Sequence, residues 1–375
     1  MSGTTTRART AGPTAGADVP HGDVPERDPG RGASAAVDHT VGSLAAGGPG
    51  VGDLGRGNAE GGVPDDVGTA LRDSTALRLT VPAKVNLALH VLGRRTDGYH
   101  ELQSLVAFAA IDDGDVVEVG FGPPAEEAPA FTVSGRFGSS VPAGPENLAA
   151  AAARHCPQIR AVHLVKGLPV AAGIGGGSAD AAAVLRAAAH RYRIDPASLA
   201  ADALSLGADV PVCLDGRPCL MEGIGEKLTP VDLPAIHAIL INPGRPLATA
   251  DVFGNLATPD NAPFMPPSVG GLEELFAWLR TTRNDLEGPA HAAMPEIGTL
   301  LQALRSTDGC RIARMSGSGP TVFGLYDDAA SRDGALDTLR ARAPQRWWIR
   351  AARFAAGTEP VPLPQPCAFP GPAPR

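Results

Sequence analysis

Lysine is scarce in this sequence of 375 residues. Of its 32 basic residues only three are lysines, Lys84, Lys166 and Lys227, and all the others are arginine. A lysine carries a compact charge on a flexible stem and reaches a phosphate or a hydroxyl where a planar guanidinium does not fit. Nucleotide composition alone could produce this bias, so the position of each lysine must decide whether it has a specific role.

The sequence also lacks an excess of basic charge, a long apolar run and paired cysteines. Its formal net charge is −8, which argues against a nucleic-acid or anionic-membrane partner because both need a basic face. No apolar run is long enough for a membrane span, and the N-terminus has no hydrophobic signal core, which predicts a cytoplasmic protein. The five cysteines are scattered without a Cys-x-x-Cys pair, so free thiols and no zinc site are expected.

Low-complexity composition marks both ends of the chain. Residues 1–75 contain no lysine, no aromatic residue and no period of 2 or 3.6, and we expect a disordered extension because they cannot bury enough apolar surface to offset chain entropy. The Pro-rich stretch 357–375 is expected to be unstructured as well. The folded part then spans 76–356, in a chain whose 43% hydrophobic and 19% charged residues are ordinary for globular proteins.

Between these ends, short apolar strands and amphipathic helices alternate without the regular period of a doubly wound parallel sheet. This predicts an α+β fold in two lobes, with a domain boundary near residue 235 that separates 76–235 from 236–356. The pattern further predicts a helix over 196–206 that ends in a turn at 207–211, and a hairpin over 214–227.

A glycine-rich stretch at 166–190 is the main candidate site. It follows a β-branched apolar run at 161–165 and leads into an Ala- and Leu-rich segment with strong helix propensity. Glycines on a strand-to-helix turn let an anion approach the backbone N–H groups, and the N-terminus of a helix attracts the same anion. Ser178 is expected to cap that helix. The local chemistry is that of a polyphosphate cradle.

Neither common nucleotide motif fits this stretch. Counting Gly-x-Gly-x-x-Gly from Gly173 puts Ser178 in the last place, and the Gly-Lys-Ser/Thr ending of a P-loop is absent. From the stretch alone, a flexible glycine loop in a glycine-rich chain stays open as the alternative.

Three stretches together resemble the motifs of one kinase superfamily in their order and spacing. They are Pro82-Ala-Lys-Val-Asn-Leu87, the loop 169–179 and Ser316-Gly-Ser-Gly-Pro-Thr321. They resemble the three motifs of the galactokinase, homoserine, mevalonate and phosphomevalonate (GHMP) kinases, over roughly residues 77–355. The sequence departs from that pattern at Ala171-Ala172, where many members carry glycine.

Three further stretches resemble one branch of the superfamily. They are Arg95-Thr-Asp-Gly-Tyr-His-Glu-Leu102, Gly207-Ala-Asp-Val-Pro-Val212 and Glu222-Gly-Ile-Gly-Glu226. This likeness implies a kinase that phosphorylates the 2-hydroxyl of a cytidyl-diphospho sugar alcohol in the non-mevalonate isoprenoid pathway. It also implies an N-terminal lobe like domain 2 of ribosomal protein S5 and a ferredoxin-like α+β C-terminal lobe.

The resemblance implies that the glycine loop binds ATP. Magnesium is expected to arrive with the nucleotide, because no paired carboxylates of a dedicated metal cage stand out and no metal ligand is assigned. The residues implied in nucleotide binding are Pro169, Val170, Ala171, Ala172, Gly173, Ile174, Gly175, Gly176, Gly177, Ser178 and Ala179.

Two residues are implied in catalysis, Asp209 as the base and Lys84 as its electrostatic partner. An aspartate in a Gly-Ala-Asp-Val-Pro stretch is otherwise a common Asx turn, and Lys84 could be a surface lysine at the end of a strand. If the resemblance holds, the ammonium holds the acceptor oxygen and offsets charge that develops on the γ-phosphate.

Substrate contacts are implied at seven positions, and each has a plainer alternative. Asn86 could be an exposed strand residue, Tyr99 could be a packed aromatic beside an Asp-Gly turn, and 316–319 could be a simple turn. The likeness instead sets Tyr99 and His100 against the cytosine ring, with Phe253 closing the stack. The implied substrate-binding residues are Asn86, Tyr99, His100, Thr249, Phe253, Ser316 and Gly317.

The remaining expectations concern partners and competing functions. ATP and the sugar alcohol are the expected small-molecule partners, and the chain is expected to be a monomer or a weak homodimer. Asn284-Asp285 is expected to support the interface between lobes. A homoserine or mevalonate acceptor, a non-catalytic ligand sensor and an RNA-binding module stay open as alternatives. The stretch 95–102 argues against the first, the pairing of Lys84 with Asp209 against the second and the acidic charge against the third.

Overall fold

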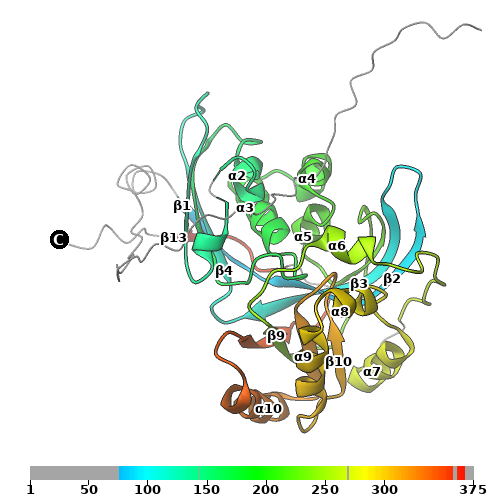
Figure 1. Cartoon of the computed structure of the whole chain (residues 1–375). Coiled ribbons are helices and arrows are strands. Elements are labelled where there is room, and N and C mark those ends of the chain that lie inside the picture. Colours follow the sequence, from blue (N-terminus) through cyan, green and yellow to red (C-terminus); the bar gives the residue numbers. More distant parts are fainter. Residues whose placement is uncertain (1–75, 143, 268–269, 358–360, 368–375) are drawn as a thin grey trace, which may run out of the picture. The chain divides into compact units, whose positions relative to one another are not determined.

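The computed structural model describes residues 76–142, 144–267, 270–357 and 361–367 (Figure 1). The extension expected at 1–75 lies outside the described residues. The strands are β1 (Ala76–Val81), β2 (Ala83–Arg94), β3 (His100–Ile111), β4 (Asp115–Phe121), β5 (Ala130–Ser134), β6 (Ile159–Val165), β7 (Cys219–Gly223), β8 (Lys227–Pro230), β9 (Ile236–Asn242), β10 (Ile312–Met315), β11 (Val322–Tyr326), β12 (Trp348–Phe354) and β13 (Gln365–Cys367).

Helices alternate with these strands, which confirms the α+β prediction. The 3-10 helices are η1 (Gly138–Ser140) and η2 (Pro196–Leu199). The α-helices are α2 (Leu148–Ala153), α3 (Gly176–Tyr192), α4 (Ala200–Leu206), α5 (Val210–Asp215), α6 (Thr249–Gly254), α7 (Leu272–Thr281), α8 (Glu287–Ala293), α9 (Glu296–Arg305) and α10 (Ala329–Arg342). Within the described part of the chain, no helix is both long enough and apolar enough to cross a membrane.

A five-stranded sheet contains β6, the strand that leads into the glycine loop. Its strand order is β13-β1-β4-β6-β5, and only β5 and β6 run parallel. Helices α2 and α3 pack on one face of this sheet (Figure 1), where alternate side chains such as Leu79, Val117 and Leu164 are fully or almost fully buried. Strand β6 ends at Val165, directly before the glycine loop.

An eight-stranded sheet joins the two halves of the sequence. Its order is β10-β11-β9-β12-β3-β7-β8, with β2 paired to β3. Strand β12 pairs antiparallel with both β9 and β3, so the ladder continues across residue 235. Both faces of the central strand β9 are covered, because Ile239 and Ile241 pack toward α9 and α10 while Leu240 packs toward α7. The domain boundary at 235 stays a prediction.

The chain changes sheets at Pro82. Strand β1 belongs to the five-stranded sheet and β2 to the eight-stranded one, and proline has no N–H with which to continue a ladder. Residues 83–91 of β2 are buried on both faces, so the alternation expected for a half-buried strand is absent there. Lys84, the second residue of β2, is therefore an interior residue.

Three local predictions are wrong in part. The turn expected at 207–211 is present at 208–209, but α5 begins at Val210, because the missing N–H of Pro211 is tolerated in the first turn of a helix. The hairpin expected over 214–227 begins at Cys219 and continues through β8. The Pro-rich tail forms β13 at its residues 365–367, which pair with β1 and so cover the edge of that sheet.

Candidate active site

The glycine loop runs from the end of β6 to the start of α3. Gly173 and Gly175 have φ values of +71° and +63°, and Ala171 has φ of +49°. Positive φ is favourable only for glycine, so Gly173 and Gly175 are needed where they stand. Ala171 adopts the left-handed region in spite of its Cβ.

Ser178 does not cap the helix, and that prediction is wrong. Helix α3 begins at Gly176 after Gly175 in the cap position, and among the described residues no side chain bonds to the cap N–H groups. Because Gly175, at φ +63°, is the residue before the helix, the helix begins earlier than expected and Ser178 is its third residue. The first N–H groups of α3 are left without a side-chain cap, which is the arrangement that suits an anion.

The first and third motifs hold the loop from both sides. The Lys84 N–H donates to the Ile174 carbonyl at 3.0 Å, and the Thr321 N–H donates to the Ala172 carbonyl at 3.2 Å. The Ser316 hydroxyl donates to the Gly173 carbonyl at 2.9 Å. A Cβ on Gly175 would lie 2.9 Å from the Lys84 Cβ, so the glycine backbone rests directly on the lysine side chain.

Lys84 and Asp209 form an ion pair beside this loop. The Lys84 Nζ donates to the Asp209 Oδ2 at 2.9 Å. The lysine side chain is only 5% exposed, whereas the aspartate side chain is 39% exposed. The surface alternative for Lys84 is therefore wrong, and one carboxylate of the pair faces solvent.

Asp209 occupies the residue before α5 but does not serve as a cap. No side-chain hydrogen bond to the N–H groups of α5 is made among the described residues, so the Asx-turn alternative fails. Its carboxylate instead reaches the ammonium of Lys84, 125 positions earlier in the chain. The sequence resemblance implied that these two residues act as partners, and the structure places them in contact.

Asn86 is buried rather than exposed. Its Nδ2 donates to the Ser104 hydroxyl at 2.7 Å, and its N–H donates to the Ser316 hydroxyl at 3.1 Å. Its Oδ1 has no partner among the described residues and faces Gly317, whose Cβ would lie 3.1 Å away. A buried amide oxygen without a donor marks a place where an additional donor would be favourable.

Ser316 and Gly317 belong to the scaffold of the loop. Ser316 is fully buried, and its hydroxyl accepts from Asn86 and donates to Gly173. The Gly317 carbonyl accepts from the Asn284 Nδ2 at 2.8 Å. In this structure the Ser316 hydroxyl is engaged by protein partners, so its predicted substrate contact stays a prediction. The hydroxyl of Thr249, the first residue of α6, bonds the Ser318 hydroxyl at 2.9 Å.

Asn284 and Asp285 join β2 to the third motif. The Asn284 Nδ2 donates to the carbonyls of Met315 and Gly317, and the Asp285 Oδ2 accepts from the Val91 N–H at 2.8 Å. The bond between Val91 and Asp285 joins segments on opposite sides of residue 235, and support of an interface between two lobes stays a prediction.

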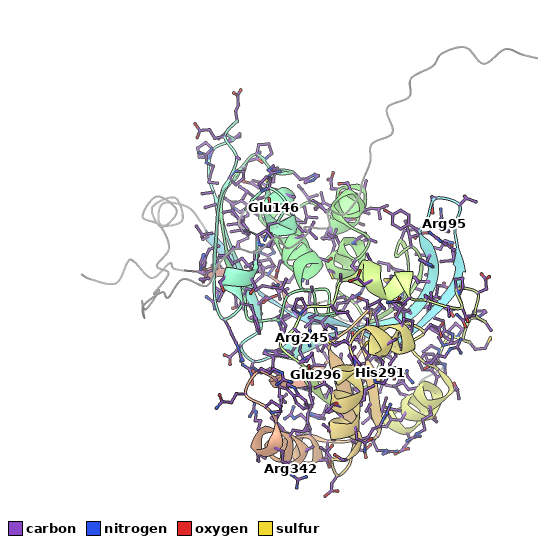
Figure 2. All side chains as sticks on the ribbon, viewed as in Figure 1. Arg95, Glu146, Arg245, His291, Glu296 and Arg342 are labelled. Carbon is purple, nitrogen blue, oxygen red and sulfur yellow. The ribbon has the colours of Figure 1, made fainter. Side chains whose placement is uncertain are left out.

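The predicted base-binding residues lie near the β2–β3 hairpin. Arg95 marks its tip (Figure 2), and Tyr99 beside it is 55% exposed, so simple packing does not explain that tyrosine. The rings of His100 and Phe253 stack at a centroid distance of 4.7 Å and an angle of 24°. Desolvation by burial, together with nearby Arg94, lowers the pKa of His100 and favours the neutral ring. Phe253 thus contacts His100 directly, and the stacking of these aromatic residues on cytosine stays a prediction.

A second lysine cluster lies behind the loop, and sequence reasoning missed it. The Lys166 Nζ donates to Asp115 Oδ2 and to Asp180 Oδ2, each at 2.6 Å, and all three side chains are at most 3% exposed. The scarcity of lysine was the signal that could have found it. The two aspartates carry no such signal, because nothing in the local sequence shows that residues 65 positions apart meet.

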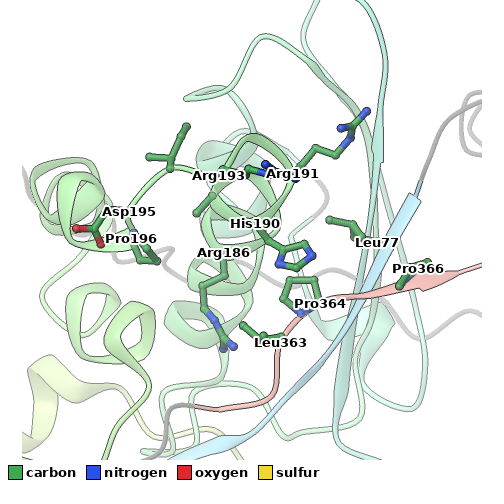
Figure 3. A pocket seen from close by; sticks show the side chains of 12 residues that line it. Leu77, Arg186, His190, Arg191, Arg193, Asp195, Pro196, Leu363, Pro364 and Pro366 are labelled. Atoms are coloured by element: carbon green, nitrogen blue, oxygen red, sulfur yellow. The ribbon is translucent and has the colours of Figure 1, made fainter.

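A hollow of about 910 Å³ lies away from this chemistry (Figure 3). It is bounded by the C-terminal half of α3, by β1 and by the segment 361–367, whereas the glycine loop is at the N-terminal end of α3. Its lining includes Arg186 and His190 but neither Lys84 nor Asp209. It is therefore separate from the candidate active site.

No dedicated metal cage is present in the part of the chain that the structure describes. Within that part, no group of three or more His, Cys, Asp or Glu side chains could hold a metal ion. The oxygen ligands near the loop are the Ser178 hydroxyl and the partly exposed Asp209 carboxylate, whereas the backbone N–H groups suit phosphate oxygens. Such a set suits a magnesium ion that takes most of its ligands from nucleotide phosphates.

Comparisons with known protein families cover most of this site. The model described as the GHMP kinases N terminal domain matches residues 146–217, which include the glycine loop and Asp209. The model described as GHMP kinases C terminal matches residues 268–345, which include the third motif. These matches and the two sheets of the structure agree with the fold class implied by the sequence.

Individual relatives match over nearly their whole length. A 4-diphosphocytidyl-2-C-methyl-D-erythritol kinase of Dinoroseobacter shibae is 48% identical over 273 residues, which are 72% of this chain and 91% of the relative. A protein of the same name from Chelativorans sp. is 47% identical over 75% of this chain and 97% of its own length.

Solved structures give the same result. A crystal structure of 4-(cytidine 5'-diphospho)-2C-methyl-D-erythritol kinase is 36% identical, with a TM-score of 0.58 over 73% of this chain and 98% of that one. A homoserine kinase from Cytophaga hutchinsonii has a TM-score of 0.56 at 16% identity and shares the fold alone. The chain is a small-molecule kinase that belongs to the 4-diphosphocytidyl-2-C-methyl-D-erythritol kinase family of the GHMP kinases.

Proposed function

We propose that this protein uses ATP to phosphorylate the 2-hydroxyl of 4-diphosphocytidyl-2-C-methyl-D-erythritol, a step of the non-mevalonate isoprenoid pathway. The observation that carries the proposal is the 2.9 Å pair of Lys84 and Asp209 beside the glycine loop. The names and the high coverage of the relatives support the choice of substrate.

The loop supplies the triphosphate site. Backbone N–H groups of 173–178 are close to the start of α3, whose dipole places partial positive charge at the same point. Because Lys84 touches both Gly175 and Asp209, the ion pair lies directly beside the loop. A γ-phosphate held by the loop would therefore face the pair.

Asp209 would accept the proton of the substrate hydroxyl. An aspartate is ordinarily a weak base for an alcohol, but phosphoryl transfer passes through a loose transition state in which the proton can leave late. The carboxylate then has to orient the hydroxyl and take its proton at the end. Its partial exposure lets it do both without breaking the bond to Lys84, since a carboxylate accepts several hydrogen bonds.

Lys84 would stabilise the charge that develops during transfer. Its ammonium is fixed by burial and by Asp209, so it needs no reorganisation when the phosphoryl group moves. Magnesium bound to the nucleotide would neutralise phosphate charge, and the Ser178 hydroxyl would hold it from the protein side. The protein would thereby hold the two reactants in line.

Recognition of the cytidyl group would fall to the aromatic cluster. Since the rings of His100 and Phe253 are in direct contact, no third ring fits between them in this conformation. The cytosine would stack on the exposed Tyr99, or His100 would give way so that Phe253 covers the other face of the base. Each stacking contact would contribute about 0.5–1.5 kcal/mol beyond area burial.

A coupled assay with ATP and 4-diphosphocytidyl-2-C-methyl-D-erythritol tests the proposal. Turnover should appear with this acceptor and be absent with homoserine or mevalonate. Lys227→Ala is the matched control for lysine replacement, because Lys227 is exposed on β8 and should leave turnover unchanged. Equal or faster turnover with another alcohol would remove the assignment of substrate.

Calorimetric titration separates the cytidyl contacts from the rest of the site. The cytidyl substrate should bind more tightly than methylerythritol phosphate, and Tyr99→Ala should reduce this preference by about 2- to 13-fold, the range that one stacking contact allows. Equal affinity of the wild-type protein for both compounds would contradict the aromatic site.

A further inference from the structure

Lys166 stands at the start of the glycine loop, directly after β6. Its side chain is 3% exposed, and its ammonium donates to two carboxylates that come from different parts of the fold. Asp115 is the first residue of β4, and Asp180 lies in the second turn of α3. One buried ammonium thus bonds to both β4 and α3, and the glycine loop leads into α3.

Asp115 holds the start of the loop. While its Oδ2 accepts from Lys166, its Oδ1 accepts from the N–H groups of Gly167 and Leu168, both at 2.8 Å. Two successive backbone donors on one carboxylate oxygen fix the direction in which the chain leaves β6. This carboxylate therefore links the lysine to the first residues of the loop.

Asp180 and the ammonium itself hold the end of the loop. Asp180 bonds Lys166 at 2.6 Å from within α3, and a Cβ on Gly176 would lie 3.0 Å from the Lys166 Nζ. The ammonium is therefore packed against the backbone of the first helical residue, on its buried side. A guanidinium would be too broad for this position, which explains a lysine here in a chain that otherwise prefers arginine.

We propose that Lys166 is a positioning residue for the nucleotide, which fixes the spacing between the start of the loop and the first turn of α3. The proposal rests on the proposed function, because it assigns the loop to ATP. A loop that is already ordered loses less conformational freedom when ligand binds, so its affinity is higher. Lys166 itself contacts no substrate and acts through the backbone of 167–176.

A purely structural role is the competing explanation. Buried ion pairs often contribute little net stability, because desolvation offsets their attraction. Here every hydrogen bond that the three side chains make among the described residues lies within the cluster or goes to the N–H groups of Gly167 and Leu168. This concentration on one loop points to a role in shaping that loop.

The test measures the affinity for ADP by calorimetry on the full chain, far below the melting temperature. Lys166→Met should weaken ADP binding by about 10-fold or more, since a hydrogen bond between charged groups contributes about 1.5–3 kcal/mol. The double variant Lys166→Met/Asp180→Asn replaces both partners of one buried hydrogen bond and provides a folded protein if the single variant does not fold. It should lose affinity to the same extent.

Two variants separate positioning from stability. Asp180→Asn keeps an oxygen that can accept from Lys166, so ADP affinity should stay within about 3-fold of wild type. In free energy, this change is less than half of what a hydrogen bond to a charged group contributes. Arg186→Met removes another largely buried cation of α3, one that bonds to the Val361 and Pro362 carbonyls at the far end of the helix (Figure 3). It should lower the melting temperature and leave ADP affinity unchanged.

The outcomes distinguish this proposal from the proposed function. If wild-type protein binds no ADP, the assignment of the loop to nucleotide fails. If wild type binds ADP and the ADP affinity of the double variant is within 3-fold of that of wild type, only the positioning role is overturned. In steady-state assays the same variants should raise the KM for ATP more than they lower kcat, a split that simple loss of folded protein does not produce.

Discussion

Two lysine–aspartate clusters flank the glycine loop, and they differ mainly in exposure. Lys84 and Asp209 lie 2.9 Å apart, with the carboxylate 39% exposed. Lys166 bonds Asp115 and Asp180 at 2.6 Å, with all three side chains at most 3% exposed. The residue types and distances are similar, but only the first cluster has a charged group that a substrate can reach.

This difference separates chemistry from scaffolding. A proton acceptor must meet its donor within hydrogen-bond distance, which an enclosed carboxylate cannot do. A group that fixes backbone must exclude competing water, which an enclosed one does well. Scarcity of lysine marked both clusters in the sequence, and only burial tells which role each has.

The largest effect is expected at the open cluster. Asp209→Asn should lower kcat by about 10²- to 10⁴-fold, because the amide cannot accept the hydroxyl proton. ADP affinity should change little, since the loop and Lys84 remain in place. Near-normal turnover of this variant, in the coupled assay, would remove Asp209 from the mechanism.

Lys84→Met should have the next largest effect. Loss of a fixed cation at the transferring phosphate should lower kcat by about 10²- to 10³-fold, the range seen for removal of one transition-state donor. The carboxylate left behind is partly exposed and therefore hydrated, so the melting temperature should fall little. A large loss of stability with unchanged kcat would make Lys84 a purely structural residue.

The closed cluster should give a dependence of stability on pH. Desolvation by burial raises the pKa of Asp180 to about 8, although the Lys166 ammonium opposes this shift. The folded state then holds a proton that the unfolded state releases near pH 4, so this contribution is full below that pH and is lost as pH rises through the raised value. Relative to Asp180→Asn, wild type should lose about 1.4 kcal/mol per pH unit between pH 5 and 7.

Urea unfolding of both proteins at pH 5, 6 and 7 measures this difference. The comparison between variants cancels the contributions of the other carboxylates. A difference in unfolding free energy that stays constant over this range would show that Asp180 is ionised in the folded protein.

The smallest effect is expected between the clusters, at Ala171. Its φ of +49° is unfavourable for alanine by about 1–2 kcal/mol, while glycine adds unfolded-state entropy worth about 0.4–1 kcal/mol. Ala171→Gly should therefore stabilise the protein by about 0.5 kcal/mol. Ala172→Gly, at a buried neighbour without positive φ, should instead destabilise it, by about 1 kcal/mol. The same sign for both variants in thermal unfolding would contradict the account of the loop.

Local patterns in the sequence predicted the fold class, the strand that precedes the glycine loop and the loop itself. Alternating apolar residues at 77–81 indicate a strand that is buried on one face, and the structure has this pattern in β1. Burial does not alternate along residues 83–91 of β2, because both faces of this strand are covered by parts of the fold that are distant in sequence. The prediction that the tail is unstructured was wrong at 365–367 for a similar reason, because the partner of these residues is the distant strand β1.

The residues of the site likewise include some that the sequence could predict and some that it could not. Lys84 and Asp209 could be paired from the sequence only because three motifs together resembled a kinase superfamily. Ser178 was expected as a cap because serine commonly caps helices, but glycine at 175 moved the start of the helix. Asp115 and Asp180 were not predicted, since their meeting with Lys166 depends on how β4, β6 and α3 pack.

A crystal structure of the complex with a non-hydrolysable ATP analogue and the cytidyl substrate tests the central claim most directly. We predict that the acceptor 2-hydroxyl lies about 2.6–3.2 Å from an Asp209 carboxylate oxygen, with the γ-phosphate beside the Lys84 ammonium and no ligand atom in contact with Lys166. A hydroxyl beyond hydrogen-bond reach of Asp209, or a phosphate bound away from the glycine loop, would contradict the account.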